Sequence, residues 1–241
     1  MLTASEFEKK IYEMQSDEEL AKIKRYFKSS EGQYSHHDTF IGVKMGDIFT
    51  LAKDFMNMPL EEVALLLNND IHEMRVGAVS IMDFKARSRK TPEVDRKALF
   101  ELYINKHDRI NNWDLVDRSA MYVVGGYLFD KSRDILYKLA QSENIWERRT
   151  AIVSTGYFIK QGEIEDTFKI AEILINDKED LIHKAAGGWL RHAGGTKHQK
   201  QLLQFLDTHA ATMPRTMLRY SIEKLDSNQK KHYMSLKNKS L

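Results

Sequence analysis

A tryptophan and an aspartate in the middle of the chain are of types that could do chemistry together. Trp113 and Asp117 stand four residues apart, so on a helix they project from the same face, one turn from each other. A carboxylate beside an aromatic plane suits a ligand that is cationic and partly apolar. The alternative is that Trp113 belongs to the core and that Asp117 is a solvated or capping carboxylate.

Two adjacent arginines, Arg148 and Arg149, lie in the string WERRTAI. Neighbouring side chains on a helix diverge by about 100°, so one can face a groove while the other faces solvent. The planar guanidinium of an arginine suits phosphate, because it donates two parallel hydrogen bonds. An ordinary intramolecular ion pair explains such arginines equally well. Other basic clusters contain Lys85, Arg87, Arg89 and Lys90, then Lys197, His198 and Lys200, and finally Arg215 and Arg219.

Several classes of site are excluded by missing motifs. The chain has no cysteine, which rules out a disulfide framework, a thiolate metal site and a cysteine nucleophile. The pair His36 and His37 is followed by Asp38, but no HExxH or comparable metal-ligand spacing occurs. There is also no GxGxxG fingerprint, P-loop or GxSxG elbow. We therefore expect neither a metal nor a cofactor.

The composition favours helices throughout. The 241 residues include only three prolines and twelve glycines, and 42% are hydrophobic and 30% charged, a balance typical of globular proteins. Apolar residues recur at spacings of three and four, and no sustained alternation of period two occurs. The first twenty residues are charged throughout, and no run of 18 apolar residues exists. We expect an all-α cytoplasmic protein without a secretory signal or a membrane span.

Four segments resemble one another at a spacing of about 35–40 residues, beginning near Ile71, Asn112, Ile145 and Leu181. In three of them an Asn/Asp-rich turn precedes the helix, as expected for N-caps. Small residues follow that allow close helix packing, namely Gly77, Ala78, Ala151, Ala185, Ala186 and Gly187. This period predicts a HEAT-like or armadillo-like solenoid, whose inner helices line a concave surface. Chance similarity between amphipathic helices is the alternative.

The small net charge of +2 hides an asymmetry. Residues 1–70 hold 8 basic and 13 acidic side chains, whereas residues 71–241 hold 29 and 22. A basic portion of this kind can concentrate positive charge on one face and bind a polyanion. Ordinary solvated helix faces would give the same counts.

Taken together, these segments resemble the AlkD family of bacterial DNA alkylation-repair glycosylases, which have a HEAT-like fold. The resemblance runs from KRYFKSSEGQYSHHDTFIGVKM (Lys24 to Met45) to about Arg191. Its more specific strings are NNWDLVD (Asn111 to Asp117), NIWERRTAI (Asn144 to Ile152) and HKAAGGWLRHAG (His183 to Gly194).

The resemblance implies hydrolysis of the N-glycosidic bond of purines alkylated at N3 or N7 in duplex DNA, without flipping of the base into a tight pocket. It implies that Trp113 faces the sugar and that Asp117 is the catalytic carboxylate. Arg149 falls on the family's phosphate-contacting arginine. We further assign DNA contacts to Arg148, Lys184, Trp189 and Arg191, and expect binding that depends on salt and little on sequence.

Two positions depart from the family pattern. The family's later helix reads Lys-Ala-x-Gly-Trp-x-Leu-Arg, but here Gly188 occupies the aromatic slot and Trp189 stands one residue later. Asn112 stands where the founding pattern has an additional tryptophan. The position of the family's catalytic carboxylate is retained as Asp117, whereas its second aromatic position is occupied by Gly188.

The sequence thus predicts one HEAT-like domain over residues 1–241, with N-terminal helices in 1–70, groove-forming repeats in about 71–225 and a polar tail in 226–241. The predicted function is a monofunctional alkylpurine DNA glycosylase that acts as a monomer on double-stranded DNA and is nucleoid-associated when bound. A non-catalytic DNA-binding relative and a protein-interaction solenoid are the alternatives.

Overall fold

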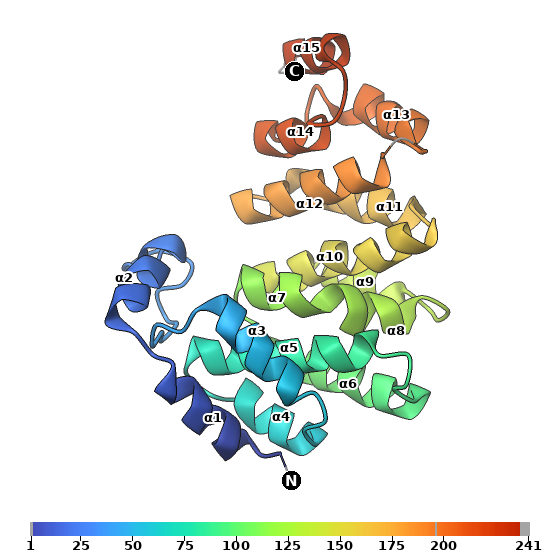
Figure 1. The fold of residues 1–241 in the computed structure, drawn as a ribbon. Helices are drawn as coiled ribbons and strands as arrows, with labels where there is room; N and C mark the ends of the chain where they lie inside the picture. The colour runs from blue at the N-terminus through green and yellow to red at the C-terminus, as the bar shows by residue number, and fades with distance from the viewer. Residues whose placement is uncertain (1, 196, 237–241) are drawn as a thin grey trace. The chain divides into compact units, whose positions relative to one another are not determined.

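The structure, a computed structural model, describes residues 2–195 and 197–236, and its regular elements are helices (Figure 1). Within those residues the only extended pairing is an isolated parallel bridge between Thr39 and Ile71. The all-α prediction is therefore confirmed. The chain divides into two compact units, Met1–Tyr127 and Leu128–Leu241.

The first unit is built around α5. Its helical segments are α1 (Ala4–Glu13), α2 (Asp17–Tyr26), α3 (Met45–Asp54), α4 (Leu60–Leu67), α5 (His72–Arg87), α6 (Glu93–Asn105), the 3₁₀ turn η1 (His107–Arg109), α7 (Trp113–Ala120), the π-helical turn η2 (Met121–Gly125) and the start of α8 (Gly126–Leu128). Helix α5 packs against α3, α4 and α7. Gly77 of α5 faces α1, where a Cβ atom would come within 2.4 Å of the Phe7 ring, so this small residue does permit a close approach.

Because α5 is buried along almost its whole length, its charged side chains need internal partners. Glu73 is fully buried, and its Oε1 accepts hydrogen bonds from the backbone amides of Ile41, Gly42 and Val43. These bonds fix the segment that leads from α2 into α3. Four further side chains of α5 also have charged partners within the first unit: His72, Arg75, Asp83 and Arg87.

In the second unit the helices pack as successive neighbours. They are α9 (Asp134–Leu139), α10 (Ile145–Gln161), α11 (Glu165–Ile173), the 3₁₀ turn η3 (Leu174–Asn176), α12 (Asp180–Ala193), α13 (Gln199–His209), α14 (Arg215–Ser221) and α15 (Ser227–Ser235). Helix α12 contacts both α10 and α14. At Gly187 a Cβ atom would lie 2.4 Å from the carbonyl oxygen of Met217, so α12 and α14 touch through a residue that has no side chain.

Each of the four similar segments does begin a helix, since α5, α7, α10 and α12 start at His72, Trp113, Ile145 and Asp180. Of the three Asn/Asp-rich turns expected to cap their helices, the one at Asn144 does so, since its side chain accepts a hydrogen bond from the amide of Trp146 at 2.9 Å. Helices α5 and α12 instead follow Ile71 and Glu179, which make no side-chain cap bond. The solenoid arrangement of these helices stays a prediction.

The segment assigned to a polar tail contains a helix. Helix α15 begins after Asp226, whose side chain accepts bonds from the amides of Asn228 and Gln229, and its Tyr233 is buried. The last part of that segment, residues 237–241, lies outside the described residues. None of the helices in the described ranges is long and apolar enough to cross a membrane.

Candidate active site

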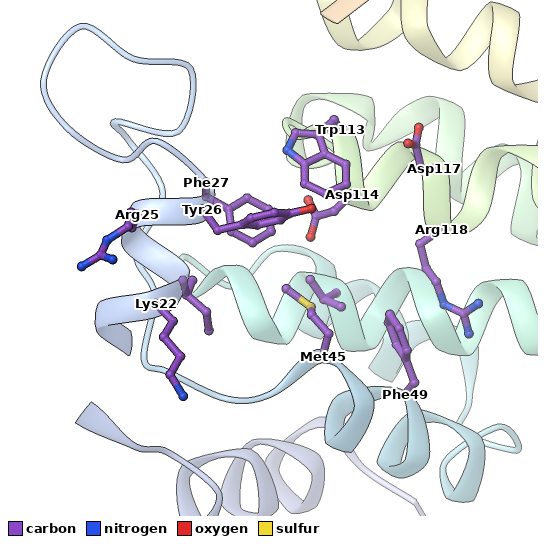
Figure 2. A pocket seen from close by; sticks show the side chains of 12 residues that line it. Lys22, Arg25, Tyr26, Phe27, Met45, Phe49, Trp113, Asp114, Asp117 and Arg118 are labelled. Carbon is purple, nitrogen blue, oxygen red and sulfur yellow. The ribbon is translucent and has the colours of Figure 1, made fainter. Parts of the chain in front are cut away.

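A cavity of about 980 Å³ opens between α2, α3 and α7 of the first unit (Figure 2). Its wall includes four aromatic side chains, Tyr26 and Phe27 from the end of α2, Phe49 from α3 and Trp113 from α7. Helix α7 also lines it with three charged side chains, Asp114, Asp117 and Arg118. The cavity thus contains both members of the Trp113–Asp117 pair.

Other rings hold the indole of Trp113 in place. It stacks on Phe27, with centroids 5.4 Å apart and planes 17° apart, and meets the edge of Tyr26 at 5.8 Å. Its Nε1 donates a hydrogen bond to the hydroxyl of Tyr34 at 3.2 Å. The ring is half-buried, so the indole is a fixed aromatic wall with one part open to the cavity.

Asp117 lies one helical turn beyond Trp113 on α7, and its side chain is exposed. Figure 2 shows the two side chains on the same stretch of α7, bordering the cavity. A carboxylate so placed can attract positive charge that develops beside the indole, and it can orient a water molecule.

The start of α7 is tied to the loop before α3. Asn112 is fully buried and caps α7 by accepting a bond from the amide of Trp113 at 2.8 Å. Its amide group donates to Ser35 at 2.6 Å and to Asp38 at 2.8 Å. Asn112 therefore has a structural role at the position where the family's founding pattern has a tryptophan.

Beneath the cavity, His72 lies between two carboxylates. Its Nε2 is 2.8 Å from Asp114 and its Nδ1 is 3.8 Å from Asp38. Burial by itself lowers the pKa of His72, but the charges and hydrogen bonds of Asp114 and Asp38 outweigh it and raise the pKa to about 9. His72 is therefore a buried cation at neutral pH, and Asp114 is its counter-ion.

Asp38 also binds Arg75, whose Nη2 lies 2.5 Å from its Oδ1. Burial raises the pKa of Asp38, but His72, Arg75 and Asn112 lower it further than burial raises it. The buried carboxylate thus stays ionised and joins α5 to Asn112, the residue that caps α7, through charge-assisted bonds.

In the second unit the two adjacent arginines have internal partners. Arg148 donates to both carboxylate oxygens of Asp177, at 2.6 and 3.2 Å, and Asp177 is almost fully buried. Arg149 is buried and donates to the carbonyl oxygen of Leu181 at 2.8 Å. Both guanidinium groups therefore help to hold α10 to the residues around the start of α12.

The basic residues assigned on α12 are more accessible. Lys184 pairs with Asp180 at 2.7 Å, one turn earlier on the same helix, and 43% of its side chain is exposed. Arg191 pairs with Glu223, whose side chain is 53% exposed. Exposed ion pairs of this kind contribute little to stability and exchange partners easily.

Trp189 and Gly188 have different surroundings. The ring of Trp189 packs on α10 at Gly156, where a Cβ atom would lie 2.4 Å from the indole. At Gly188 a Cβ atom would meet nothing within 4 Å. The half-buried Trp189 thus packs against α10, while the position before it borders open space.

Sequence reasoning assigned no role to several residues of the site. Tyr26, Phe27 and Tyr34 lie in the string that carries the resemblance, but their types alone do not show that they would reach Trp113. The partners of His72 are equally hidden, because Asp38 and Asp114 lie far from it in the sequence. Among the described residues no cluster of His, Cys, Asp or Glu could hold a metal ion.

One family, described as DNA alkylation repair enzyme, has a sequence model that matches residues 7–225 of the chain. Among solved structures, the chain is similar to one described as a predicted DNA alkylation repair enzyme from Enterococcus faecalis. The two share 17% identity with a TM-score of 0.66, over 89% of this chain and 98% of that one, a likeness that shows the fold alone. No curated protein sequence matches the chain significantly.

Proposed function

The chain belongs to the family of DNA alkylation repair enzymes, and we propose that it is a monofunctional DNA glycosylase. Its proposed substrates are purines alkylated at N3 or N7 in duplex DNA, and the base is not flipped into a tight pocket. The proposal depends on one observation above all: the exposed carboxylate of Asp117 borders an aromatic cavity one helical turn from Trp113.

The chemistry needs little more than this pair. A purine alkylated at N3 or N7 is already cationic, so it leaves without a strong general acid. When the bond between C1′ and the base breaks, its electrons pass to the base and neutralise it, and positive charge develops on the sugar. The oxygen of a water molecule then bonds to C1′ and releases a proton. Asp117 stabilises the charged sugar and orients the water.

Asp117 suits this role better than its neighbour Asp114. Asp114 also lines the cavity, but its side chain is only 13% exposed and lies 2.8 Å from the buried His72. The exposed Asp117 can approach a sugar, and the face of Trp113 adds attraction for the developing cation. Neither residue forms a covalent intermediate, in keeping with a glycosylase that uses no lysine.

The proposed partner is double-stranded DNA, bound by a monomer. Its backbone contacts are assigned to Arg149, Arg148, Lys184, Arg191 and Trp189. Lys184 and Arg191 suit this best, because their present partners are exposed carboxylates that phosphates can replace. Arg148 would have to leave a nearly buried partner, Asp177, which costs more.

The test is release of free base from methylated duplex DNA. Wild-type protein should release 7-methylguanine or 3-methyladenine and leave unmethylated duplex intact, and Asp117→Asn should lose that release. Release by Asp117→Asn at the wild-type rate would remove Asp117 from the mechanism. No release by wild-type protein over long incubation would refute the glycosylase.

A second candidate function is DNA binding without excision. It is favoured by Gly188, which leaves the family's second aromatic position without a side chain. Binding that weakens steeply with salt, together with no released base, would support this alternative.

A further inference from the structure

Three charged residues beside the cavity have no part in the chemistry proposed above. Arg118 follows Asp117 on α7, and Asp83 and Arg87 lie one turn apart on α5. Nε of Arg87 is 2.8 Å from Oδ2 of Asp83, and Nη1 of Arg118 is 3.0 Å from the same atom. The two guanidinium groups therefore meet at one buried carboxylate.

Arg118 is held in one orientation from several sides. Its Nε donates to the hydroxyl of Ser80 at 3.0 Å. Its guanidinium carbon lies 4.6 Å from the ring centroid of Phe49 and 4.7 Å from that of Phe84. The side chain lines the cavity, and 18% of it is exposed. Arg118 thus presents its remaining N–H groups without having to lose rotamer freedom on binding.

Arg87 is fixed in a similar way but is more accessible. Its guanidinium lies 4.1 Å from the ring centroid of Tyr122, and 45% of the side chain is exposed. Within the part of the chain that the structure describes, Arg87 pairs with Asp83 through Nε, and its two terminal nitrogens make no hydrogen bond. Both terminal nitrogens are therefore available for an additional acceptor.

This cluster has an excess of one positive charge, because two arginines share one carboxylate. Burial lowers the pKa of Arg118, Asp83 raises it, and the like charge of Arg87 lowers it. Burial raises the pKa of Asp83, which the two arginines oppose. A further anion would relieve the repulsion between the two guanidinium groups.

Arg133 in the second unit shows the opposite balance. Its side chain is also 18% exposed and lies over an aromatic ring, 3.9 Å from the centroid of Phe158. It pairs with two carboxylates, Asp166 at 2.5 Å and Glu163 at 2.7 Å. This group of one arginine and two carboxylates has a net negative charge, so it does not attract a further anion.

We propose that Arg118 and Arg87 bind one phosphodiester group of the DNA strand beside the cavity. This inference rests on the proposed function only in taking DNA as the ligand. A phosphodiester carries a single negative charge, which matches the single excess charge of the cluster. Its two free oxygens can each accept N–H bonds from one guanidinium. The contact would hold the strand next to Asp117 without reading its sequence.

The experiment measures binding of an unmodified duplex as a function of salt for wild-type protein, Arg87→Gln and Arg118→Gln. Each substitution should weaken binding about tenfold, and the slope of log K against log salt should fall by about one. The matched control, Arg133→Gln, should keep the wild-type affinity and slope. Wild-type values for both Arg87→Gln and Arg118→Gln would overturn the inference.

Two further variants guard against misfolding, since Arg118→Gln deprives the buried Asp83 of a partner. Arg118→Lys keeps the charge but loses the planar group, and should still lose several-fold affinity. Arg87→Gln leaves the Arg118–Asp83 pair intact, so its result decides the matter if the Arg118 variants unfold.

Two additional measurements separate this inference from other outcomes. If 1 mM inorganic phosphate at constant ionic strength removes the difference in DNA affinity between wild type and Arg87→Gln, free phosphate competes with the DNA backbone for this site, which supports the assignment. Base release tests the glycosylase separately. If the arginine variants bind DNA more weakly but wild-type protein releases no base, the phosphate site is supported and the glycosylase is refuted. If the variants bind DNA like wild type and wild-type protein releases base, the glycosylase is supported and the phosphate site is refuted.

Discussion

Two tryptophans at the starts or middles of similar helices have different roles in the two units. Trp113 forms a cavity wall, stacked on Phe27 and bonded to Tyr34. The ring of Trp189 packs against α10 at Gly156, where a side chain would clash with it. The residue opposite each indole decides whether the ring borders a site or fills a gap, so residue type and repeat position do not determine the role.

Charge differs between the units in a similar way. Residues 128–241 contain 19 basic and 14 acidic side chains, and residues 1–127 contain 18 and 21. Yet three of the six arginines of the second unit, Arg148, Arg191 and Arg133, pair with the carboxylates of Asp177, Glu223 and Asp166. A cluster with more arginines than carboxylates, formed by Arg87, Arg118 and Asp83, lies instead in the first unit, which has the negative net charge. Net charge therefore does not show where positive charge is available.

The largest expected difference between the units is in pH dependence. Because the pKa of His72 is raised to about 9 from 6.5, the folded first unit keeps a proton that the unfolded chain loses. The resulting stabilisation is complete below pH 6.5 and is lost as the pH rises through 9. The free energy of unfolding should fall by up to about 3 kcal/mol over that window.

Chemical denaturation between pH 6 and pH 9.5 checks this expectation, with His72→Gln as the comparison. The variant lacks the titrating group, so its stability should fall much less over the same range. The same fall in both proteins would show that His72 is not the buried cation.

Replacing each tryptophan by alanine tests the comparison directly. Trp113→Ala should slow base release about 30-fold, a loss of about 2 kcal/mol of transition-state stabilisation. Trp189→Ala should leave a cavity against α10 and cost about 2 kcal/mol of stability, with release slowed less than about fivefold. Thermal melts and single-turnover assays on both variants measure the two effects, and a reversed pattern would mean that Trp189 borders the site and Trp113 fills a gap.

The smallest expected effect is a gain. Gly188→Trp has room for its Cβ, because nothing lies within 4 Å of that position. If the slot is the missing aromatic wall, release should rise several-fold, up to about tenfold. Gly156→Ala is a useful contrast, since it crowds the Trp189 ring and should lower the melting temperature instead. An unchanged rate in Gly188→Trp would show that the slot does not face the substrate.

The sequence predicted what local spacing controls. Helical periodicity and scarce prolines indicated the all-α fold, and a spacing of four put Trp113 and Asp117 on the same helix. The cap at Asn144 followed from the chemistry of its side chain. These features depend on residues that lie within one or two helical turns of each other in the sequence, so they can be predicted from the sequence alone.

Long-range pairing could not be predicted in the same way. The contacts of Asp38 with His72 and Asn112, and of Arg148 with Asp177, join residues separated by about 30 positions or more. Any of several carboxylates could have served each arginine, and only packing selects one. For the same reason the sequence could not distinguish arginines already paired with carboxylates from those with N–H groups available.

The most direct test of the central claim is the single-turnover rate of base release by wild-type protein, Asp117→Asn and Asp54→Asn on duplex DNA containing 7-methylguanine. Asp54 is an exposed carboxylate at the end of α3 and serves as the matched control. We predict a rate at least about 100-fold lower for Asp117→Asn, with DNA affinity retained, and an unchanged rate for Asp54→Asn. Equal rates for all three proteins would contradict the account.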